Sequence, residues 1–288
     1  AGETITTGTR NIAIGWRTMW DLDAGSNSAD SEDNIAIGYA AMNGTWADAK
    51  SENNVAIGSN SMAAALNAAT NNTAVGYFSL NAITSGDNNI GIGSEAGGSL
   101  TSGIKNTIMG VQAGDAMTST NYTTLIGFQA GTAINSTDAN GTVAIGYLAG
   151  TAITSGQYNT AIGFEAGKNQ VTADSNTFVG YQSGRQTTGN NNTAIGKYTM
   201  YEGAGADYNT AIGTNALQNT TSDYNTALGY NALTSVLGGY RNTALGANAG
   251  DALTTGLENV IIGYESEASA VDADNQIVIG ASTTGLGN

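Results

Sequence analysis

A short apolar segment that ends in an aliphatic residue or Met followed by glycine recurs sixteen times along this chain, most often as Asn-Thr-Ala-Ile-Gly. The copies settle to one every sixteen or seventeen residues. The repeat glycines are Gly15, Gly38, Gly58, Gly76, Gly93, Gly110, Gly127, Gly146, Gly163, Gly180, Gly196, Gly213, Gly229, Gly246, Gly263 and Gly280. A repeat of this length, with strand-forming residues at the same place in every copy, is typical of a solenoid, in which each repeat is one coil stacked on the last. We therefore predict an all-β fold, a parallel β-solenoid.

The repeats predict a single β-solenoid shaft of about sixteen coils over residues 1–288. The coils in 11–71 are longer and irregular, those in 72–280 are regular, and 281–288 is a C-terminal tail. The absence of proline suits an uninterrupted ladder of hydrogen-bonded strands. The chain starts without Met, and no polar cap follows the last repeat, so we expect a processed or excised piece of a longer protein.

Both faces of the repeated strand are apolar. The residue before each repeat glycine is Ile, Val, Leu or Met, and we predict that it points into a core. The preceding residue lies on the opposite face and is usually Ala. Because a strand without a polar face is covered on both sides, we predict that the Ala face packs on the same strand of a neighbouring chain. A small residue three positions after each glycine predicts the inward position of a return strand.

An asparagine recurs four residues before the repeat glycine in most coils, and stacked amides can bond to one another along a solenoid. We predict such a ladder from Asn11, Asn34, Asn54, Asn72, Asn89, Asn106, Asn159, Asn176, Asn192, Asn209, Asn225, Asn242 and Asn259, with Thr123, Thr142 and Gln276 as exceptions.

Composition argues against much chemistry. The chain has no Cys and no His, which removes disulfides, thiolate metal sites and the usual general base at neutral pH. Its carboxylates lie singly in loops, so we expect neither an enzyme nor a bound cofactor. The net charge of −15, with eight scattered basic residues, argues against nucleic acid as a partner. No apolar run approaches the ~20 residues that span a bilayer, so we expect no membrane insertion.

The motif Asn209-Thr-Ala-Ile-Gly213, followed by Ala216-Leu217, resembles the head repeats of trimeric autotransporter adhesins (YadA-like heads) and the related stalk repeats of bacteriophage tail fibres. Asn225-Thr-Ala-Leu-Gly229-Tyr-Asn-Ala-Leu233 carries the same resemblance. The closing Asn275-Gln-Ile-Val-Ile-Gly280 is similar to the segment that precedes an intramolecular chaperone in many such fibres.

The resemblance implies a left-handed parallel β-roll, an intertwined or side-by-side homotrimer, and a role in reaching or attaching to a cell surface. The coils are longer than those of adhesin heads, and a neck and membrane anchor are missing, which favours a fibre. We therefore expect a shaft protein of a viral (phage) tail fibre or related appendage, located in the virion or outside the cell. The alternative is a trimeric autotransporter adhesin head that binds host matrix or glycans. The expected partners are two further copies of the chain and a cell-surface glycan or protein receptor.

Several aromatic residues are candidates for receptor or packing contacts. Trp16, Trp20 and Trp46 fall in the long first coils, where they could cap the solenoid, dock a preceding domain or recognise a partner. Tyr122, Tyr158, Tyr208 and Tyr224 lie in connecting loops just before a strand. An aromatic residue also follows the repeat glycine in nine coils, a pattern that favours a stacked ladder over a row of sugar-binding rings.

Two other functions were weighed against these. The acidic stretch from Asp21 to Asp33 carries oxygen ligands that Ca²⁺ could use, although it lacks a fixed ligand spacing and favours a solvated loop. Ice binding needs flat rows of outward Thr, whereas the repeated Thr shares its face with the aliphatic residue that we predict to be in the core.

Overall fold

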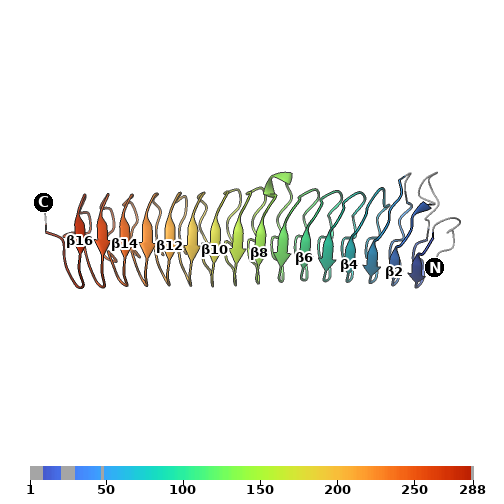
Figure 1. Cartoon of the computed structure of the whole chain (residues 1–288), viewed down its shortest axis with the longest axis horizontal. Helices are drawn as coiled ribbons and strands as arrows, with labels where there is room; N and C mark the ends of the chain where they lie inside the picture. Colours follow the sequence, from blue (N-terminus) through green and yellow to red (C-terminus); the bar gives the residue numbers. More distant parts are fainter. Residues whose placement is uncertain (1–8, 21–29, 47–48, 287–288) are drawn as a thin grey trace. The chain divides into compact units, whose positions relative to one another are not determined.

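The computed structural model describes residues 9–20, 30–46 and 49–286, which form sixteen short parallel strands and the turns between them. The chain divides into two compact units, Ala1–Ile145 and Gly146–Asn288, and each is described by itself. In both units the order of the strands in space is their order in the sequence (Figure 1). The predicted all-β parallel β-solenoid is therefore confirmed.

Every strand ends at the residue before a repeat glycine. The first unit contains β1 (Ile12–Ile14), β2 (Ile35–Ile37), β3 (Val55–Ile57), β4 (Thr73–Val75), β5 (Ile90–Ile92), β6 (Thr107–Met109), β7 (Thr124–Ile126), the short 3₁₀ helix η2 (Thr137–Ala139) and β8 (Val143–Ile145). The second contains β9 (Thr160–Ile162), β10 (Thr177–Val179), β11 (Thr193–Ile195), β12 (Thr210–Ile212), β13 (Thr226–Leu228), β14 (Thr243–Leu245), β15 (Val260–Ile262) and β16 (Ile277–Ile279).

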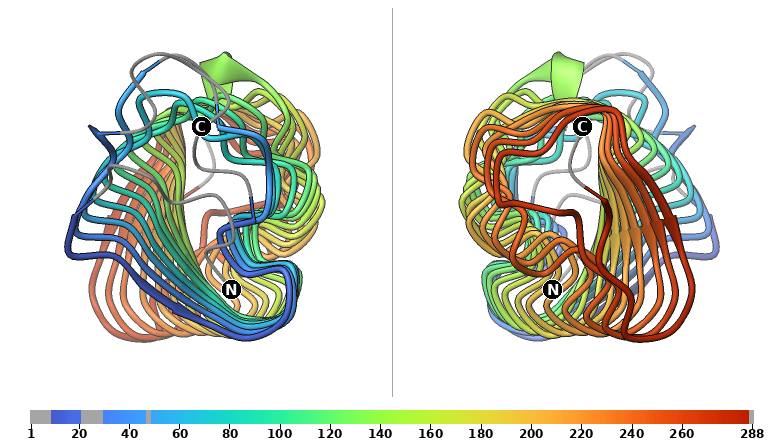
Figure 2. Two further views of the ribbon diagram at one scale, coloured as in Figure 1. Left: turned by 90° about the vertical axis from the view of Figure 1, so that its right-hand side faces the viewer. Right: turned by 90° about the vertical axis from the view of Figure 1, so that its left-hand side faces the viewer.

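Neighbouring strands pair in the register that the sequence repeat predicts. Phe178 of β10, for example, lies beside Ala194 of β11, and Val179 lies beside Ile195. Seen along the stack, the successive coils of each unit follow one another closely (Figure 2). Equivalent residues therefore form continuous rows within each unit, which is the arrangement that side-chain ladders require.

The predicted orientation of the strands is wrong. The central strand residue, usually Ala, is buried in every strand from β2 to β16, whereas none of the residues before the repeat glycines is buried. Ile14 is 57% exposed and Leu228 is 44% exposed. The Ala face thus lines the inside of the coil, and the row of Ile, Val, Leu and Met lies outside.

The reason for this orientation is the small volume inside a coil. Where the central residue is Ala194, a large residue, Met200, stands four positions after the repeat glycine, and both are fully buried. Where the central residue is Phe178, the position four residues after the repeat glycine is itself glycine, both in the same coil (Gly184) and in the coil before it (Gly167). A Cβ on Gly167 would lie 3.0 Å from the Phe178 ring. Next to the strand, the central residue and the residue four positions after the glycine together have room for only one large side chain per coil, since native packing is dense. It cannot also hold the two flanking residues of each strand.

The segment after each repeat glycine is a turn, and the predicted return strand is absent from the described residues. The small residue three positions after the glycine is nevertheless buried in fifteen of the sixteen coils, so its inward position is confirmed. The interior is closed by larger residues further along the turn, among them Ile83, Leu100 and Ile134.

The predicted asparagine ladder is confirmed. Asn225 Oδ1 accepts hydrogen bonds from the backbone N–H and the side-chain amide of Asn242, at 3.0 and 3.2 Å. The Asn242 amide also donates to the Gly256 carbonyl, at 2.8 Å. Thr123, predicted as an exception, uses its backbone N–H and its hydroxyl to donate to Asn106 Oδ1. The amides hold successive coils together and satisfy buried turn carbonyls, which would be costly to leave unpaired.

Replacing Asn209 with Ala is expected to lower the free energy of unfolding by about 2–4 kcal/mol, because at least two buried polar groups lose a partner. Asn209 accepts from the Asn225 N–H at 2.8 Å and donates to the Ser222 carbonyl at 2.9 Å. Chemical denaturation followed by circular dichroism measures the change. The matched control is Asn169→Ala at an exposed position, expected to change stability by less than about 0.5 kcal/mol. Equal effects of the two substitutions would rule out a stabilising role for the ladder.

Candidate functional site

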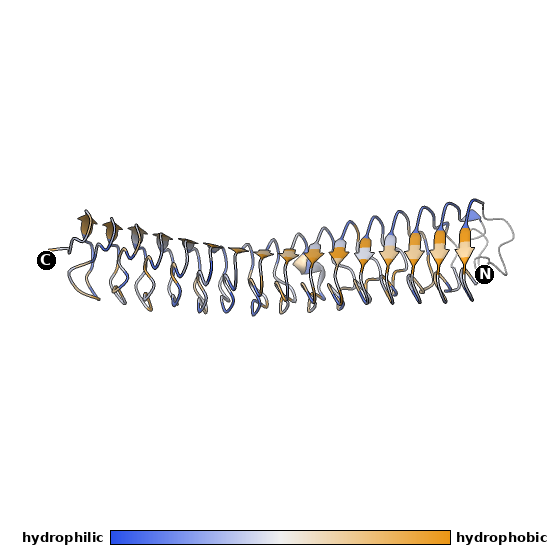
Figure 3. Cartoon of the chain, turned by 90° about the horizontal axis from the view of Figure 1, so that it is seen from below, coloured by the Kyte–Doolittle hydropathy of each residue, from blue (hydrophilic) through white to orange (hydrophobic). Residues whose placement is uncertain are grey.

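The outer face of the sheet exposes a row of apolar side chains in each unit. Two of the three residues of every strand point outward, and none of them is buried in any strand. Ile12, Ile57, Ile90, Met109, Ile195, Ile212, Leu245, Ile277 and Ile279 each expose more than a third of their surface. The strands of the first unit are coloured largely toward the hydrophobic end of the scale in Figure 3. A continuous apolar strip of this kind marks an interaction surface.

A second polar ladder, which the sequence analysis missed, runs along the outside of the turns before the strands. In the second unit, Asp174, Asn190, Asp207 and Asp223 occupy equivalent positions six residues before their repeat glycines. Each accepts a hydrogen bond from the backbone N–H of the equivalent residue one coil earlier, as Asp223 Oδ1 does from Asp207 at 2.8 Å. We call this row the outer polar ladder. The recurrence of Asp or Asn six residues before the repeat glycine is the sequence pattern from which this ladder could have been predicted.

The residue after each of these positions adopts a left-handed backbone, and we call it the corner position. Tyr122, Tyr158, Tyr208 and Tyr224 all occupy it, with φ between +54° and +59°. Their side chains are 51–65% exposed. The sequence prediction that they lie where a partner could reach them is therefore consistent with their exposure.

The four corner tyrosines differ in their contacts. Tyr208 and Tyr224 come from adjacent coils and stack face to face, with ring centroids 5.0 Å apart and planes 1° apart. The Lys105 ammonium lies 5.4 Å from the centre of the Tyr122 ring. Tyr158 is the most exposed of the four, at 65%.

The three tryptophans are not brought together into one site. Trp16 is 63% exposed and contacts Tyr39, with ring centroids 5.3 Å apart. The Arg17 guanidinium lies 5.3 Å from the Trp16 ring and 5.4 Å from the Trp20 ring. Trp46 is fully buried, so within this chain it serves packing and is not accessible to a receptor.

The row of aromatic residues after the repeat glycines forms a partial ladder in the second unit. Tyr147, Phe164 and Tyr181 stack in sequence, with centroid separations of 5.0 and 5.2 Å and interplanar angles of 16° and 11°. Each ring is 41–45% exposed. The stacking of neighbours is the packing arrangement that the sequence favoured.

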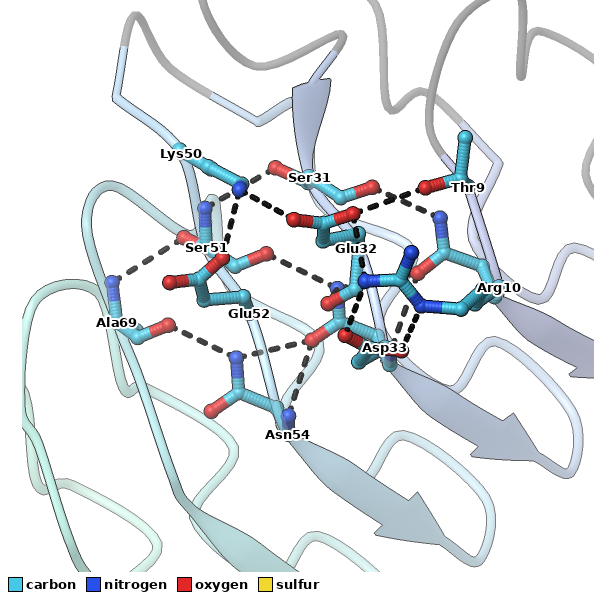
Figure 4. A network of polar contacts seen from close by, with 12 residues as sticks. Thr9, Arg10, Ser31, Glu32, Asp33, Lys50, Ser51, Glu52, Asn54 and Ala69 are labelled. Carbon is cyan, nitrogen blue, oxygen red and sulfur yellow. Dashed lines mark hydrogen bonds and ion pairs between the residues drawn. The ribbon is translucent and has the colours of Figure 1, made fainter.

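The acidic stretch at the start of the chain is engaged by cations of the protein itself (Figure 4). Arg10 binds Asp33 through two nitrogens at 2.6 and 2.7 Å, and Lys50 bridges Glu32 and Glu52 at 2.6 and 2.8 Å. Hydrogen bonds from Lys50 and Thr9 lower the pKa of Glu32, and the bond from Arg10 lowers the pKa of Asp33. Asp23 lies outside the described residues. Over residues 9–20, 30–46 and 49–286 no group of three or more acidic side chains could hold a metal ion.

Carboxylates from adjacent coils do meet, contrary to the sequence prediction that they lie singly. Asp115 is close enough to Glu95 for that charge, after burial, to raise the Asp115 pKa. Glu267 lies beside Asp251, and its Oε1 accepts the Asp251 N–H at 3.1 Å. Burial first, then a side-chain hydrogen bond with Asp251 and the charge of Asp251, raise the pKa of Glu267 to about 8. The stacking of adjacent coils brings these pairs together.

We expect the stability of the second unit to fall between pH 5 and pH 9, because Glu267 binds its proton more tightly when folded. Its folded pKa of about 8 lies above the ordinary 4.5 of a glutamic acid. The resulting stability is complete below pH ~4.5 and is lost as the pH rises through about 8. Glu267→Gln should raise the melting temperature at pH 8 and flatten its pH dependence in differential scanning calorimetry. The control Glu265→Gln, at an exposed neighbour, should keep the wild-type slope; an unchanged slope for Glu267→Gln would contradict the assignment.

In the part of the chain that the structure describes, no helix has the length and apolar character needed to cross a membrane. Comparison of the sequence with protein-family models and with curated proteins finds no match. The resemblance to fibre and adhesin repeats therefore rests on the repeated motif of the sequence.

Proposed function

We propose that this chain is a structural shaft protein that assembles as a homotrimer in a viral tail fibre or a related appendage and supports attachment to a host cell surface. The observation that carries the proposal is the outward row of Ile, Val, Leu and Met at the end of every strand, none of which is buried. The inverted strand orientation strengthens the case for assembly, because the face left for a neighbouring chain carries Ile, Val and Leu instead of Ala.

Energetics favour covering this strip. Burying an aliphatic side chain completely contributes about 1.5–3 kcal/mol, so covering the remaining two fifths of an Ile contributes about 1 kcal/mol. The outer residues repeat in every coil, and identical rows on neighbouring chains can face each other around an axis. The number of three chains is taken from the resemblance to trimeric fibres and adhesins.

Mechanically, such a shaft depends on its ladders. Backbone hydrogen bonds, the buried asparagines and the interior rows tie each coil to the next, and in repeat proteins stability accumulates from these nearest-neighbour contacts. The proposed location is the virion or the extracellular space, and no chemistry is assigned to the chain. An adhesin head on a bacterial surface is the alternative setting for the same assembly.

The outward Thr residues favour a second candidate function. In β9 to β14 the first strand residue is Thr throughout, and none of the six is buried. The argument against ice binding, that this Thr shares a face with the core, therefore no longer holds. Parallel strands with an outward Thr every ~4.8 Å form a regular array of the kind that ice binding needs.

The mass in solution separates these functions. Light scattering of the full chain should give three times the chain mass of 29.0 kDa if the strip is an interface between copies. A monomer at all concentrations would contradict the shaft proposal. Retarded growth of ice crystals by that monomer, with a normal rate after Thr193→Lys, would then support ice binding.

A further inference from the structure

A hollow of about 430 Å³ opens on the second unit beside the corner row. Tyr224, Tyr240, Asp223 and Arg241 line it, together with three small residues. Its volume lies in the range of about 300–1,000 Å³ that is usual for small-molecule sites. The hollow combines aromatic rings with charged groups, which the outer face of the sheet does not.

The hollow lies where the outer polar ladder stops. That ladder runs through Asp174, Asn190, Asp207 and Asp223, but the equivalent residue of the next coil is Tyr240. A tyrosine cannot reproduce the short carboxylate bridge to the coil before it. The following coil has Leu257 at this position, and the ladder resumes only with Asp274, whose Oδ1 accepts the Leu257 N–H at 2.7 Å. The break therefore lacks two successive bridging side chains, and Tyr240 forms an aromatic wall at its start.

Two aromatic side chains border the hollow from adjacent coils. Tyr224 is 53% exposed and is supported from behind by the stacked ring of Tyr208. Tyr240 is 39% exposed, and the Arg241 guanidinium lies 5.3 Å from its ring centroid. Stacking limits the freedom of these rings, so less entropy is lost when a ligand packs on them.

The polar groups are held in place by the protein. Arg241 is paired with Glu258 at 2.9 Å, and Asp223 is fixed by the Asp207 N–H. The Ser222 hydroxyl donates to the Gly239 carbonyl at 2.5 Å and accepts the Asn225 side-chain amide at 3.4 Å, which leaves one lone pair of its oxygen to accept a further hydrogen bond. The hollow thus offers donors from Arg241 and acceptors from Asp223 and Ser222.

We propose that this hollow binds one ring of a neutral saccharide, with the ring face on Tyr224 or Tyr240 and its hydroxyls on Arg241 and Asp223. A sugar ring combines an apolar C–H face with hydroxyls that both donate and accept, which matches an aromatic wall bordered by such groups. This proposal rests on the proposed function, attachment to a host cell surface, and names a glycan of that surface as the group that the chain binds.

The local charge disfavours other ligands that stack on aromatic rings. Asp223 lines the hollow with Arg241, Arg241 is paired with Glu258, and the chain carries a net charge of −15. A nucleotide or another phosphate would meet these carboxylates, since phosphate binding needs an excess of Lys or Arg. The site is also too polar for a wholly apolar ligand.

The test uses the full chain and saturation-transfer NMR with glucose, galactose, mannose and N-acetylglucosamine at millimolar concentration. We expect saturation transfer to at least one of the four sugars. Tyr224→Asn and Tyr240→Asp should each weaken that binding by about tenfold or more, equivalent to about 1.4 kcal/mol. Both replacements are residues that the chain itself uses at these positions: Asn191 at the corner, and Asp207 in the ladder.

The matched control is Tyr158→Asn, an exposed corner tyrosine away from the hollow, which should bind like the wild type. No transfer to any of the four sugars, unchanged binding after both substitutions, or equal loss in the control would each overturn the proposal. A trimer that binds no sugar would overturn this inference alone. A monomer that binds sugar through Tyr224 would overturn the shaft proposal and leave the site intact.

Discussion

Replacing Ile195 and Ile212 together with lysine is expected to convert the proposed trimer into folded monomers. The two side chains lie on the outer faces of β11 and β12 and are 38% and 36% exposed. Neither is part of the coil interior, so the substitutions should not disturb the fold of a single chain. Light scattering should report a fall from three times 29.0 kDa to one chain mass, with an unchanged circular dichroism spectrum.

The size of the effect follows from the charge that the interface would have to bury. Three chains would bring six ammonium groups to one segment of the interface, and each loses solvation on burial at a cost of several kcal/mol. Only about 1 kcal/mol is gained by covering each outer Ile, so neighbouring coils do not compensate for the lost pairs. The disruption should be weaker at high salt, because the repulsion between lysines is screened.

The control is the double variant Val171→Lys and Val271→Lys, which adds the same charge at exposed positions outside the strands. These valines are 43% and 51% exposed. We expect this variant to retain the wild-type mass. If the strand variant kept that mass as well, the outer face of β11 and β12 would not be an interface between copies.

Substituting the repeat glycine Gly93 with Ala is expected to cost about 3 kcal/mol or more of stability. Its φ of +131° lies in a region that L-residues rarely adopt, and such strain alone costs on the order of 1–3 kcal/mol. In addition, a Cβ would lie 2.6 Å from the Gly110 carbonyl oxygen of the next coil. Because that atom is backbone, relief requires the two coils to separate and weakens the Gly110–Ile92 and Gly97–Ala113 hydrogen bonds between them.

Hydrogen exchange measured by mass spectrometry locates this effect. Amides of β4, β5 and β6 should exchange much faster in Gly93→Ala than in the wild type, since each coil is stabilised by its immediate neighbours. The control Gly238→Ala places its Cβ 3.7 Å from the Thr255 methyl group, an ordinary contact, and should be neutral or slightly stabilising. Wild-type exchange rates in the Gly93 variant would show that the coils tolerate a side chain at this row.

Much of the fold follows from the periodic sequence. The register of the parallel strands is set by the spacing of the repeat glycines, and the asparagine ladder follows from the same period. The inward position of Ala113 and its equivalents was also predictable, because a small residue recurs there without a polar alternative larger than Thr. These features are local, repeated in each coil and independent of how wide the coil interior is.

The candidate sites were predicted only in part. The sequence indicated that Tyr208 and Tyr224 lie before their strands, but their stacking required adjacent coils to align these positions. The hollow beside them lies where Tyr240 interrupts a polar ladder that the sequence analysis did not detect. Likewise, Asp251 and Glu267 look separate in the sequence and meet because one coil spans the interval between them.

The sequence by itself determined that this chain is a stack of coils, whereas the tertiary structure decided which face of each strand is inside. Alternation divides a strand into two faces, one usually with Ala and the other with an aliphatic residue or Met beside Thr, Ile or Val, so polarity alone did not show which face is inside. The choice depends on volume: Ala194 needs Met200 to fill its coil, and Phe178 needs Gly167. The side chains that face the interior must together fit the space that a closed coil encloses. This limit places Ala inside and the row of Ile outside.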